Sequence, residues 1–513
     1  MHSTAAFLDV TDWAVILLYL GGIVALGLRW RHEQRTTRDY FLGSRNVPWW
    51  GIGLSIVAAE TSALTVIGVP AMAFGENLRF LQMIAGYVIA RVILAVVMVP
   101  HYFKGEIYSP YELFGRAFGA PARQTAGGLF LLSETLAAGV RVYVACIPVQ
   151  LMLGIQVLPA ILLFVGLSLV YTYVGGVKAV IWTDAVQFGL FLFGGLFAIA
   201  YIPALFDGGW SEVWGEARAA GKLVWFNPRL TAGPPFNIWM GLIGGTVMVM
   251  SSHGAEQLIV QRVLACQGVA EGRRALILSA VLILPLFFVF LLAGAMLWVY
   301  FQHFPMAIAL PEVKPGSGIK ANDFVFPIFM LTAVPHMLRG FLIVAILAAA
   351  MSSVSSALTS LASVATMDFA RHLLPAKDEA FKLRFSRYAT VGWAVALAGV
   401  AYLSREVAFV LNAAFSLRGL TSGALLGGLL LALFSRRGGA RPVVVGMLVS
   451  VAVMIGVQGL PRWSLTREWW MQRVGTEVFW PWYTLIGTLV TLAVAWIVRL
   501  GRRQDARVEP QSA

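Results

Sequence analysis

Charged residues are scarce in this chain: Asp, Glu, Lys and Arg together make up 12% of its 513 residues, whereas 59% of the residues are hydrophobic. A typical soluble domain carries about 25% charged residues, so the composition argues against an ordinary soluble fold. Many apolar runs also reach the roughly 20 residues that a helix needs to cross a bilayer. The composition therefore predicts an all-α polytopic membrane protein.

Cysteine and acidic residues are also few. The two cysteines, Cys146 and Cys266, offer neither a disulfide framework nor a metal site. The excess of basic over acidic residues gives a formal charge of +13. In a membrane protein this is first a topology signal, so nucleic acid is not expected as a partner. The start, MHSTAAFLDV, lacks the basic segment of a secretory signal peptide, and we expect the first apolar run to be retained.

The apolar runs predict thirteen membrane spans. They are Trp13–Leu28, Pro48–Phe74, Phe80–Val99, Thr125–Gly154, Leu158–Val174, Ala179–Leu205, Asn237–Val263, Ala275–Phe301, Met337–Met367, Tyr388–Leu403, Val407–Phe434, Pro442–Leu460 and Trp480–Val498. Basic residues follow the odd-numbered spans, among them Arg262 after the seventh. Because basic loops accumulate on the cytoplasmic side, we predict a plasma-membrane protein with its N-terminus outside and its C-terminus inside. Two long outer connections, 206–236 and 303–336, are candidates to cover a site.

The ninth span carries a stripe of hydroxyl groups at helical spacing. Its members are Ser352, Ser355, Ser356, Thr359 and Ser363. In lipid such a stripe has two interpretations. Small residues allow close packing between helices, and oxygen atoms are the ligands that a hard cation prefers. The stripe alone favours packing, and the other polar segments of the chain decide between the two.

Ionisable residues inside spans are costly and usually face a cavity, a partner or a substrate path. The candidates are Glu60, Arg91, Glu134, Arg141, Asp184, His253, Glu256 and Arg418. Span two combines Glu60 and three hydroxyl residues with Gly68 and Pro70, and Met250–Gln257 in span seven is similarly polar. Such clusters are typical of discontinuous helices, whose unwound carbonyl groups coordinate cations. The two spans lie five apart, as a five-plus-five inverted repeat requires.

Each of these side chains also has a structural interpretation. Asp184 is suited to a helix N-terminus or to neutralising a monovalent cation beside the serine-rich span. Glu134 and Arg141 are seven residues apart, two helical turns, so they are suited to an ion pair or to substrate binding. His253 precedes a glycine, where capping competes with a substrate contact. The sequence leaves these alternatives open.

Four segments, in order along the chain, resemble motifs of the sodium/solute symporter family, which includes sodium/glucose, sodium/proline and sodium/sialic acid transporters. They are DYFLGSRNVPWWGIGLSIVAAETSA, YTYVGGVKAVIWTDAVQ, GAEQLIVQR and AAAMSSVSSALTSLASVATMD. The resemblance runs from Asp39 to about Phe434. It implies a leucine-transporter-like fold with ten core helices in two inverted halves, and alternating access with substrate and ion near the midplane.

The resemblance implies a domain division and two sodium sites. The divisions are 1–46 (first helix and basic loop), 47–205 (first five-helix repeat), 206–236 (outer loop), 237–435 (second repeat) and 436–513 (two extra helices and a tail). The first sodium site matches the carbonyls of Ala58, Thr61 and Ala349 and the hydroxyls of Ser352 and Ser353. A second site, which some members have, matches Asp184, Ser352, Ser355 and Ser356.

The resemblance also places the candidate substrate ligands, and here the chain departs from the sugar-transporting members. Glu60 stands where they carry asparagine, Ser252 where they carry an aromatic gate, and Arg418 where they carry glutamine. Arg141 matches an arginine of sialic-acid-type members, and Gln82 lies where relatives hold a polar ligand; Ser62, Thr65 and His253 complete the set. The arginines suit a carboxylate. Glu60 would instead neutralise Arg418, leaving a zwitterionic or neutral solute, or bind an amine.

The sequence therefore predicts a sodium-coupled symporter that imports a small polar, carboxylate-bearing organic solute, with Na⁺ as the co-transported ion. Two alternatives remain. A sensor on the same fold would bind solute and signal, although no signalling domain fits the short tail after Arg503. A proton-coupled carrier would use Asp184 or Glu60 as its titrating group. An enzyme is not expected, since no nucleophile-base pair or cofactor motif is present.

Overall fold

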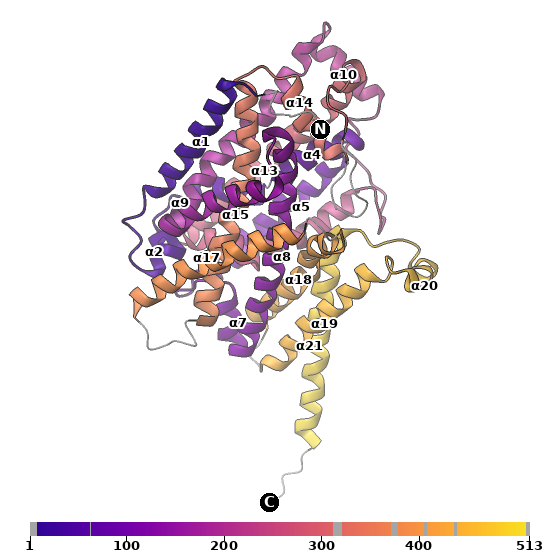
Figure 1. The fold of residues 1–513 in the computed structure, drawn as a ribbon. Helices are drawn as coiled ribbons and strands as arrows, with labels where there is room; N and C mark the ends of the chain where they lie inside the picture. Colours follow the sequence, from indigo (N-terminus) through magenta and orange to yellow (C-terminus); the bar gives the residue numbers. More distant parts are fainter. Residues whose placement is uncertain are drawn as a thin grey trace, which may run out of the picture.

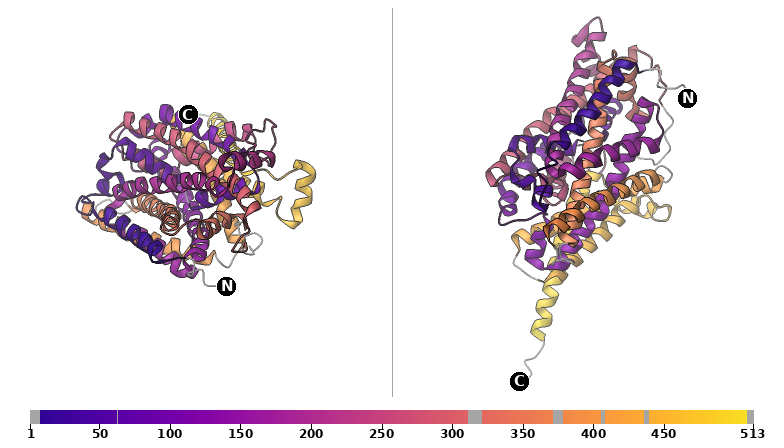
Figure 2. Two further views of the ribbon diagram at one scale, coloured as in Figure 1. Left: turned by 90° about the horizontal axis from the view of Figure 1, so that it is seen from above. Right: turned by 60° about the vertical axis from the view of Figure 1, so that its left-hand side comes forward.

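The computed structural model describes residues 8–61, 63–310, 321–370, 378–404, 408–435 and 439–508, and contains helices and no strands within these ranges. The helices are α1 (Val10–Leu28), α2 (Thr37–Leu42), α3 (Trp49–Glu60), α4 (Ala63–Gly75), α5 (Leu81–Ile93), α6 (Val99–Tyr102), α7 (Tyr111–Phe118), α8 (Ala120–Leu153), α9 (Val157–Tyr201), α10 (Gly209–Ala219), α11 (Thr246–Gly254), α12 (Gln257–Leu264), α13 (Val269–His303), α14 (Val325–Thr332), α15 (Leu338–Val364), α17 (Glu379–Leu403), α18 (Ala408–Phe434), α19 (Ala440–Gly459), α20 (Ser464–Val474) and α21 (Tyr483–Val508). They form a bundle beyond which the far end of α21 extends (Figures 1 and 2).

Two helices are broken in the middle, as the sequence predicts. The first break follows α3, where Thr61 is extended at φ −82° and ψ 94°, and the axes on either side of it are bent by 56°. The second break separates α11 from α12, where Glu256 is extended at φ −99° and ψ 134°. Each half of the fold therefore begins with a discontinuous helix, which is the arrangement that an inverted repeat requires.

Helix α9 contains two predicted spans in one element. Its 45 residues would reach about 68 Å as a straight helix, roughly twice the hydrocarbon core of a bilayer. Gly176 interrupts it with φ 56° and ψ −155°. A side chain is not tolerated there, because a Cβ atom would lie 2.5 Å from the carbonyl oxygen of Tyr40. The chain turns at Gly176, so spans five and six are separate crossings.

Seven helices of the described ranges are long and apolar enough to cross a membrane, or eight if the bent pair α3 and α4 is one span. The second crossing of α9 adds another. The remaining predicted spans coincide with α8, α11 with α12, α17 and α18. The fold is thus compatible with thirteen spans, and the chain is a multi-pass membrane protein.

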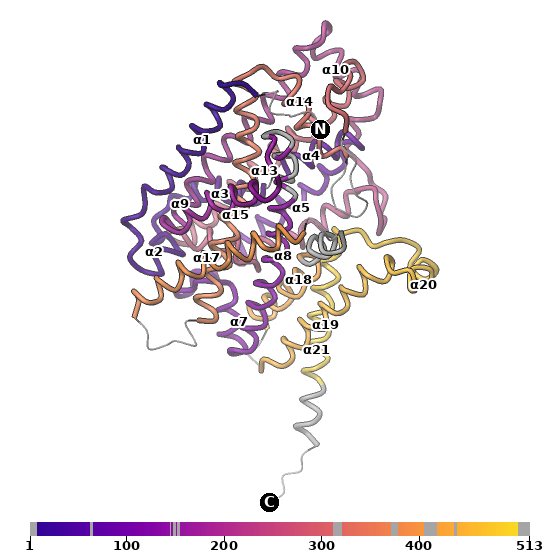
Figure 3. Tube along the Cα trace, viewed as in Figure 1, coloured from indigo at the N-terminus to yellow at the C-terminus, as the bar shows by residue number. Residues whose placement is uncertain are grey.

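Helix α15 lies at the centre and packs against α1, α8 and α9 (Figures 1 and 3). Nearly all of its side chains are buried. Two hydroxyls of the serine stripe bond within the helix: Ser355 donates to the carbonyl of Ser352, and Thr359 donates to the carbonyl of Ser355. Packing therefore accounts for part of the stripe. Ser352 faces α3 and α9, and Ser356 and Ser363 face α12.

The outer connection 206–236 lies against the segment that precedes α21. The backbone N–H of Phe479 donates to the carbonyl of Ala232 at 2.9 Å, and the indole of Trp482 donates to the carbonyl of Thr231 at 3.3 Å. Phe236 packs on the rings of Phe479 and Trp480. Helix α20 projects from the side of the bundle in Figure 1. The long outer loop is thus joined to a C-terminal segment.

Candidate functional site

A cavity of about 900 Å³ lies between the two broken helices, α8 and α18. Five of the predicted substrate residues line it together: Glu60, Arg141, Ser252, His253 and Arg418. They come from the end of α3, from α8, from α11 and from α18, which are far apart in the sequence. The fold therefore gathers most of the predicted substrate residues at one site.

Glu60 forms a buried cluster with Arg91 and His253. Its carboxylate pairs with the guanidinium of Arg91, which is fully buried on α5. His253 Nε2 lies 3.1 Å from Arg91 Nη2 and 3.6 Å from the Glu60 carboxylate, and His253 Nδ1 lies 2.9 Å from the hydroxyl of Ser252. Because a guanidinium can only donate, Nε2 accepts, and the proton of a neutral ring would be on Nδ1. Arg91 is thus paired with Glu60, a partner that the sequence does not predict.

The other two arginines of the cavity are also paired. Arg418 Nε donates to Glu256 at 2.9 Å, and Arg141 pairs with Glu134 on α8. The structural interpretation of Glu134 and Arg141 as an ion pair is confirmed. The expected pairing of Glu60 with Arg418 is wrong, because the break before α12 brings Glu256 to Arg418 while α5 brings Arg91 to Glu60.

Two of the predicted substrate residues lie outside the cavity lining. Gln82 accepts from the backbone N–H of Asn227 at 2.9 Å and so holds the outer loop, and neither Gln82 nor Thr65 is among the described residues that line the cavity. Ser62 lies outside the described residues. Their roles as substrate ligands stay predictions.

The end of α3 meets the serine-rich helix where the first sodium site is expected. The hydroxyl of Ser352 lies 3.3 Å from the carbonyl oxygen of Ala58, and the hydroxyl of Ser353 lies 3.1 Å from that of Ala349. Thr61, with its non-helical backbone, is fully buried beside them. Uncharged carbonyl and hydroxyl oxygens suit a hard monovalent cation, so the residues present fit sodium.

Asp184 lies beside this site, at the centre of a buried polar network. Ser352 donates to Asp184 Oδ1 at 2.7 Å, and Ser55 donates to Oδ2 at 2.6 Å. Arg262 also reaches Oδ2 at 2.9 Å and the hydroxyl of Ser356 at 2.5 Å. The predicted second sodium ligands Asp184, Ser352 and Ser356 therefore converge, but a guanidinium lies among them. The second site stays a prediction.

Arg262 was expected among the loop cations that follow span seven, and this expectation is wrong. It lies on α12 and is 1% exposed. The half-helix after the break directs Arg262 inward to Asp184. Its charge therefore pairs with a buried carboxylate and does not mark a cytoplasmic loop. Sequence position alone could not distinguish Arg262 from Arg273, which is exposed.

Part of the cavity lining has no counterpart among the predicted site residues. Tyr87 on α5 lies beside Arg91, and Arg462, Glu477 and Trp480 line the cavity from the connections flanking α20. Tryptophans concentrated at 463–482 are the signal that points to this segment, since interfacial segments of membrane proteins are rich in them. The C-terminal helices therefore contribute to the site.

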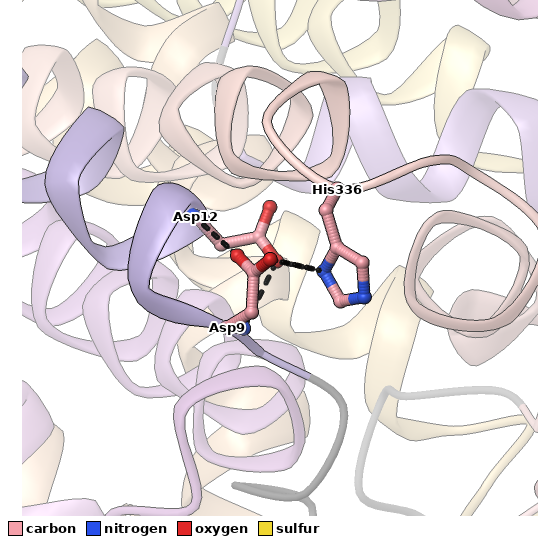
Figure 4. Close-up of side chains that lie close together, drawn as sticks. All are labelled: Asp9, Asp12 and His336. Carbon is pink, nitrogen blue, oxygen red and sulfur yellow. Dashed lines mark hydrogen bonds and ion pairs between the residues drawn. The ribbon is translucent and has the colours of Figure 1, made fainter.

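A second polar cluster joins α1 to the start of α15 (Figure 4). Asp12 is fully buried; its Oδ1 accepts from the backbone N–H groups of Met337 and Gly340, and its Oδ2 lies 2.7 Å from His336 Nδ1. Asp9 caps α1, and hydrogen bonds from the Thr11 hydroxyl and the Asp12 N–H hold its pKa below the usual range. These contacts of Asp12 are those of a helix cap for α15, and we assign the cluster to that role.

We expect Asp12→Ala to lower the free energy of unfolding by about 1–3 kcal/mol, because two backbone N–H groups and His336 lose their buried acceptor. Thermal unfolding of the purified protein in detergent measures this. The matched control is Thr11→Ala, which removes an exposed hydroxyl that donates to Asp9. Equal stabilities for the two variants would contradict the capping role.

Comparison with known proteins agrees with this architecture. The model of the sodium:solute symporter family matches residues 40–450. The sodium/sialic acid symporter of Proteus mirabilis is 31% identical over 87% of this chain and 89% of its own length. A sodium-dependent multivitamin transporter of Oryctolagus cuniculus is 28% identical over 88% of this chain and 70% of its own. The solved structure of a Na⁺-coupled sialic acid symporter, substrate-bound and outward-open, superposes with a TM-score of 0.82 at 26% identity, covering 96% of this chain and 98% of that one.

Two broken helices around a polar midplane cavity define a secondary transporter of the leucine-transporter-like, five-plus-five class. The chain belongs to the sodium:solute symporter family. As a member of that family it is a sodium-coupled symporter of a small organic solute, with Na⁺ as its co-transported ion. Its partners are thus the solute, sodium and the lipid bilayer.

Proposed function

We propose that this protein imports a small polar, carboxylate-bearing organic solute across the plasma membrane by alternating access, with one or two sodium ions. The observation that carries the proposal is the contact between the broken end of α3, at Ala58, and Ser352 on α15. An ion held there would join the two elements in the solute-loaded conformation. Each sodium charge that enters adds about 2.3 kcal/mol per 100 mV of membrane potential.

In this proposal the first ion is held by Ala58, Thr61, Ala349, Ser352 and Ser353, and a second by Asp184 with Ser352, Ser355 and Ser356. The solute is held by Glu60, Arg141, Ser252, His253 and Arg418, which line one cavity. The repeats are 47–205 and 237–435, with the N-terminus outside and the C-terminus in the cytoplasm. The relatives described above are named as carriers, which supports a transporter rather than an enzyme.

Uptake by proteoliposomes tests the proposal. The purified protein is reconstituted, and a panel of sialic acid, monocarboxylates, sugars and amino acids is offered with an inward gradient of sodium or of potassium. We expect at least one solute to accumulate only with sodium, and its accumulation to collapse when an ionophore dissipates the gradient. Flux driven by a proton gradient alone would favour the proton-coupled alternative, and binding without flux would favour the sensor.

A further inference from the structure

The charged side chains of the cavity are matched acid to base. Among the described residues that line it, three are acidic and three are arginines: Glu60, Glu256, Glu477, Arg141, Arg418 and Arg462. Each is in an ion pair: Glu256 with Arg418, Glu477 with Arg462 at 3.8 Å, and Glu60 and Arg141 with the partners behind them. With a neutral His253, the wall of the cavity carries no net charge.

The two members of each inner pair differ in how far they face the cavity. The side chains of Arg418, Arg141 and Glu60 are 33%, 17% and 16% exposed. Their partners Glu256, Glu134 and Arg91 are 5%, 2% and 0% exposed, respectively. The surface that a solute meets thus presents mainly the guanidinium groups of Arg418 and Arg141 and the carboxylate of Glu60. Glu256 also lines the cavity but is largely covered, and Glu134 and Arg91 lie behind the lining.

These opposite charges are on different helices. Glu60 is the last residue of α3, Arg141 is on α8 and Arg418 is on α18. A solute between them therefore meets an anionic group on one wall and cationic groups on the others. Tyr87 also lines the cavity, but the guanidinium of Arg91 already lies 5.9 Å from the centroid of its ring, so the anionic group open to a cationic nitrogen is the carboxylate of Glu60.

A solute with a net charge would be poorly matched to a cavity lining whose own charges sum to zero. A monoanion would bring an extra charge into a buried site whose arginines already have carboxylate partners, and a buried charge without its own partner is costly. A zwitterion adds no net charge, and each of its ends meets a group of opposite sign. The guanidinium of an arginine can donate two hydrogen bonds to the carboxylate of the zwitterion, and the carboxylate of Glu60 can pair with the ammonium group of the zwitterion.

We infer that the solute is a zwitterion of the amino acid or betaine class, with its carboxylate toward Arg418 and Arg141 and its cationic nitrogen toward Glu60. This inference rests on the proposed function, because it assigns the substrate class of the same cavity. It sets the chain apart from a carrier of monoanions, although a relative named for sialic acid is 31% identical.

Matched solutes test the inference on the wild-type protein. Sodium-dependent uptake and competition are measured for aliphatic and aromatic amino acids and betaines, each beside its desamino carboxylate and its carboxamide, and for sialic acid. We expect a zwitterion to compete at least tenfold better than its desamino carboxylate and its carboxamide. A preference for a monoanion, an amine or an uncharged sugar would overturn the inference and leave sodium coupling intact. Absence of any sodium-dependent uptake would instead count against the proposed function.

A double variant examines the role of Glu60. Glu60→Gln with Arg91→Gln removes the inner carboxylate and leaves the net charge unchanged, so we expect the zwitterion to lose its advantage over the desamino carboxylate. The control pair is Arg123→Gln with Asp368→Asn, which neutralises a contact of 2.7 Å outside the cavity lining and should leave the preference unchanged. An unchanged preference in the Glu60 and Arg91 variant would contradict the assignment of Glu60. If that variant does not fold, the wild-type comparison still decides.

Discussion

Arg262→Ala is expected to destabilise the protein by about 3–5 kcal/mol, because it leaves the carboxylate of Asp184 buried without a counter-charge. The two side chains are 1% and 0% exposed and lie 2.9 Å apart. Arg262 also donates to Ser55 at 2.8 Å and to the carbonyl of Leu258 at 2.5 Å, so those two acceptors lose a donor as well. Thermal unfolding in detergent and the folded yield after gel filtration measure the effect.

Two further variants separate charge from packing. Asp184→Asn with Arg262→Gln removes both charges together, and we expect it to recover a large part of the lost stability, since no unpaired ion remains. Arg274→Ala removes an exposed arginine of the same region and should have little effect. If Arg262→Ala were as stable as Arg274→Ala, Arg262 would not be the counter-charge of Asp184.

The second large effect is expected for Ser352→Ala. Its hydroxyl lies 2.7 Å from Asp184 Oδ1 and 3.3 Å from the carbonyl of Ala58, between the two proposed sodium sites. A hydrogen bond to a charged group is worth about 1.5–3 kcal/mol. We expect the loss of one sodium–oxygen contact to cost a similar free energy. The sodium concentration for half-maximal uptake should therefore rise roughly ten- to a hundredfold.

The matched control is Ser360→Ala on the same helix. Ser360 is equally buried, but its hydroxyl donates to the carbonyl of Ala357, one turn back, at 3.0 Å. We expect its sodium dependence to match that of the wild type. If both variants kept wild-type sodium dependence, the hydroxyls of α15 would serve packing alone. If both shifted equally, the effect would be one of helix stability rather than of ion binding.

The broken helices and the position of Asp184 could be predicted because their signals are local. Polar residues such as Glu60 and Thr61 weaken an apolar helix, and the break does follow Glu60, whereas Gly68 and Pro70 lie within α4. The family motif that contains Asp184 occurs in the expected order along the chain. In the structure, the hydroxyl of Ser352 on α15 donates a hydrogen bond to Asp184. Composition thus predicts a helical membrane protein, and the resemblance to the family implies the class of fold and the expected place of the ion site.

Glu134 and Arg141 on α8 could be predicted as an ion pair, but the pairs between helices could not, since each depends on how helices far apart in sequence are set against one another. Glu256 and Arg418 are 162 residues apart, and Glu60 and Arg91 are 31 apart. Nothing in the sequence near Glu60 distinguishes Arg91 from Arg418 as its partner. The lining at 462–484 was also missed, because the resemblance to the family ends at about Phe434 and covers none of it.

The central claim is that sodium and solute move together, and the most direct measurement is of both fluxes in the same proteoliposomes. Radiolabelled sodium and solute are followed at a clamped membrane potential. The account predicts that adding solute raises sodium entry in a fixed ratio of one or two ions per solute, and that Ser352→Ala lowers both fluxes in parallel at limiting sodium. Solute entry with no accompanying sodium entry would contradict the account.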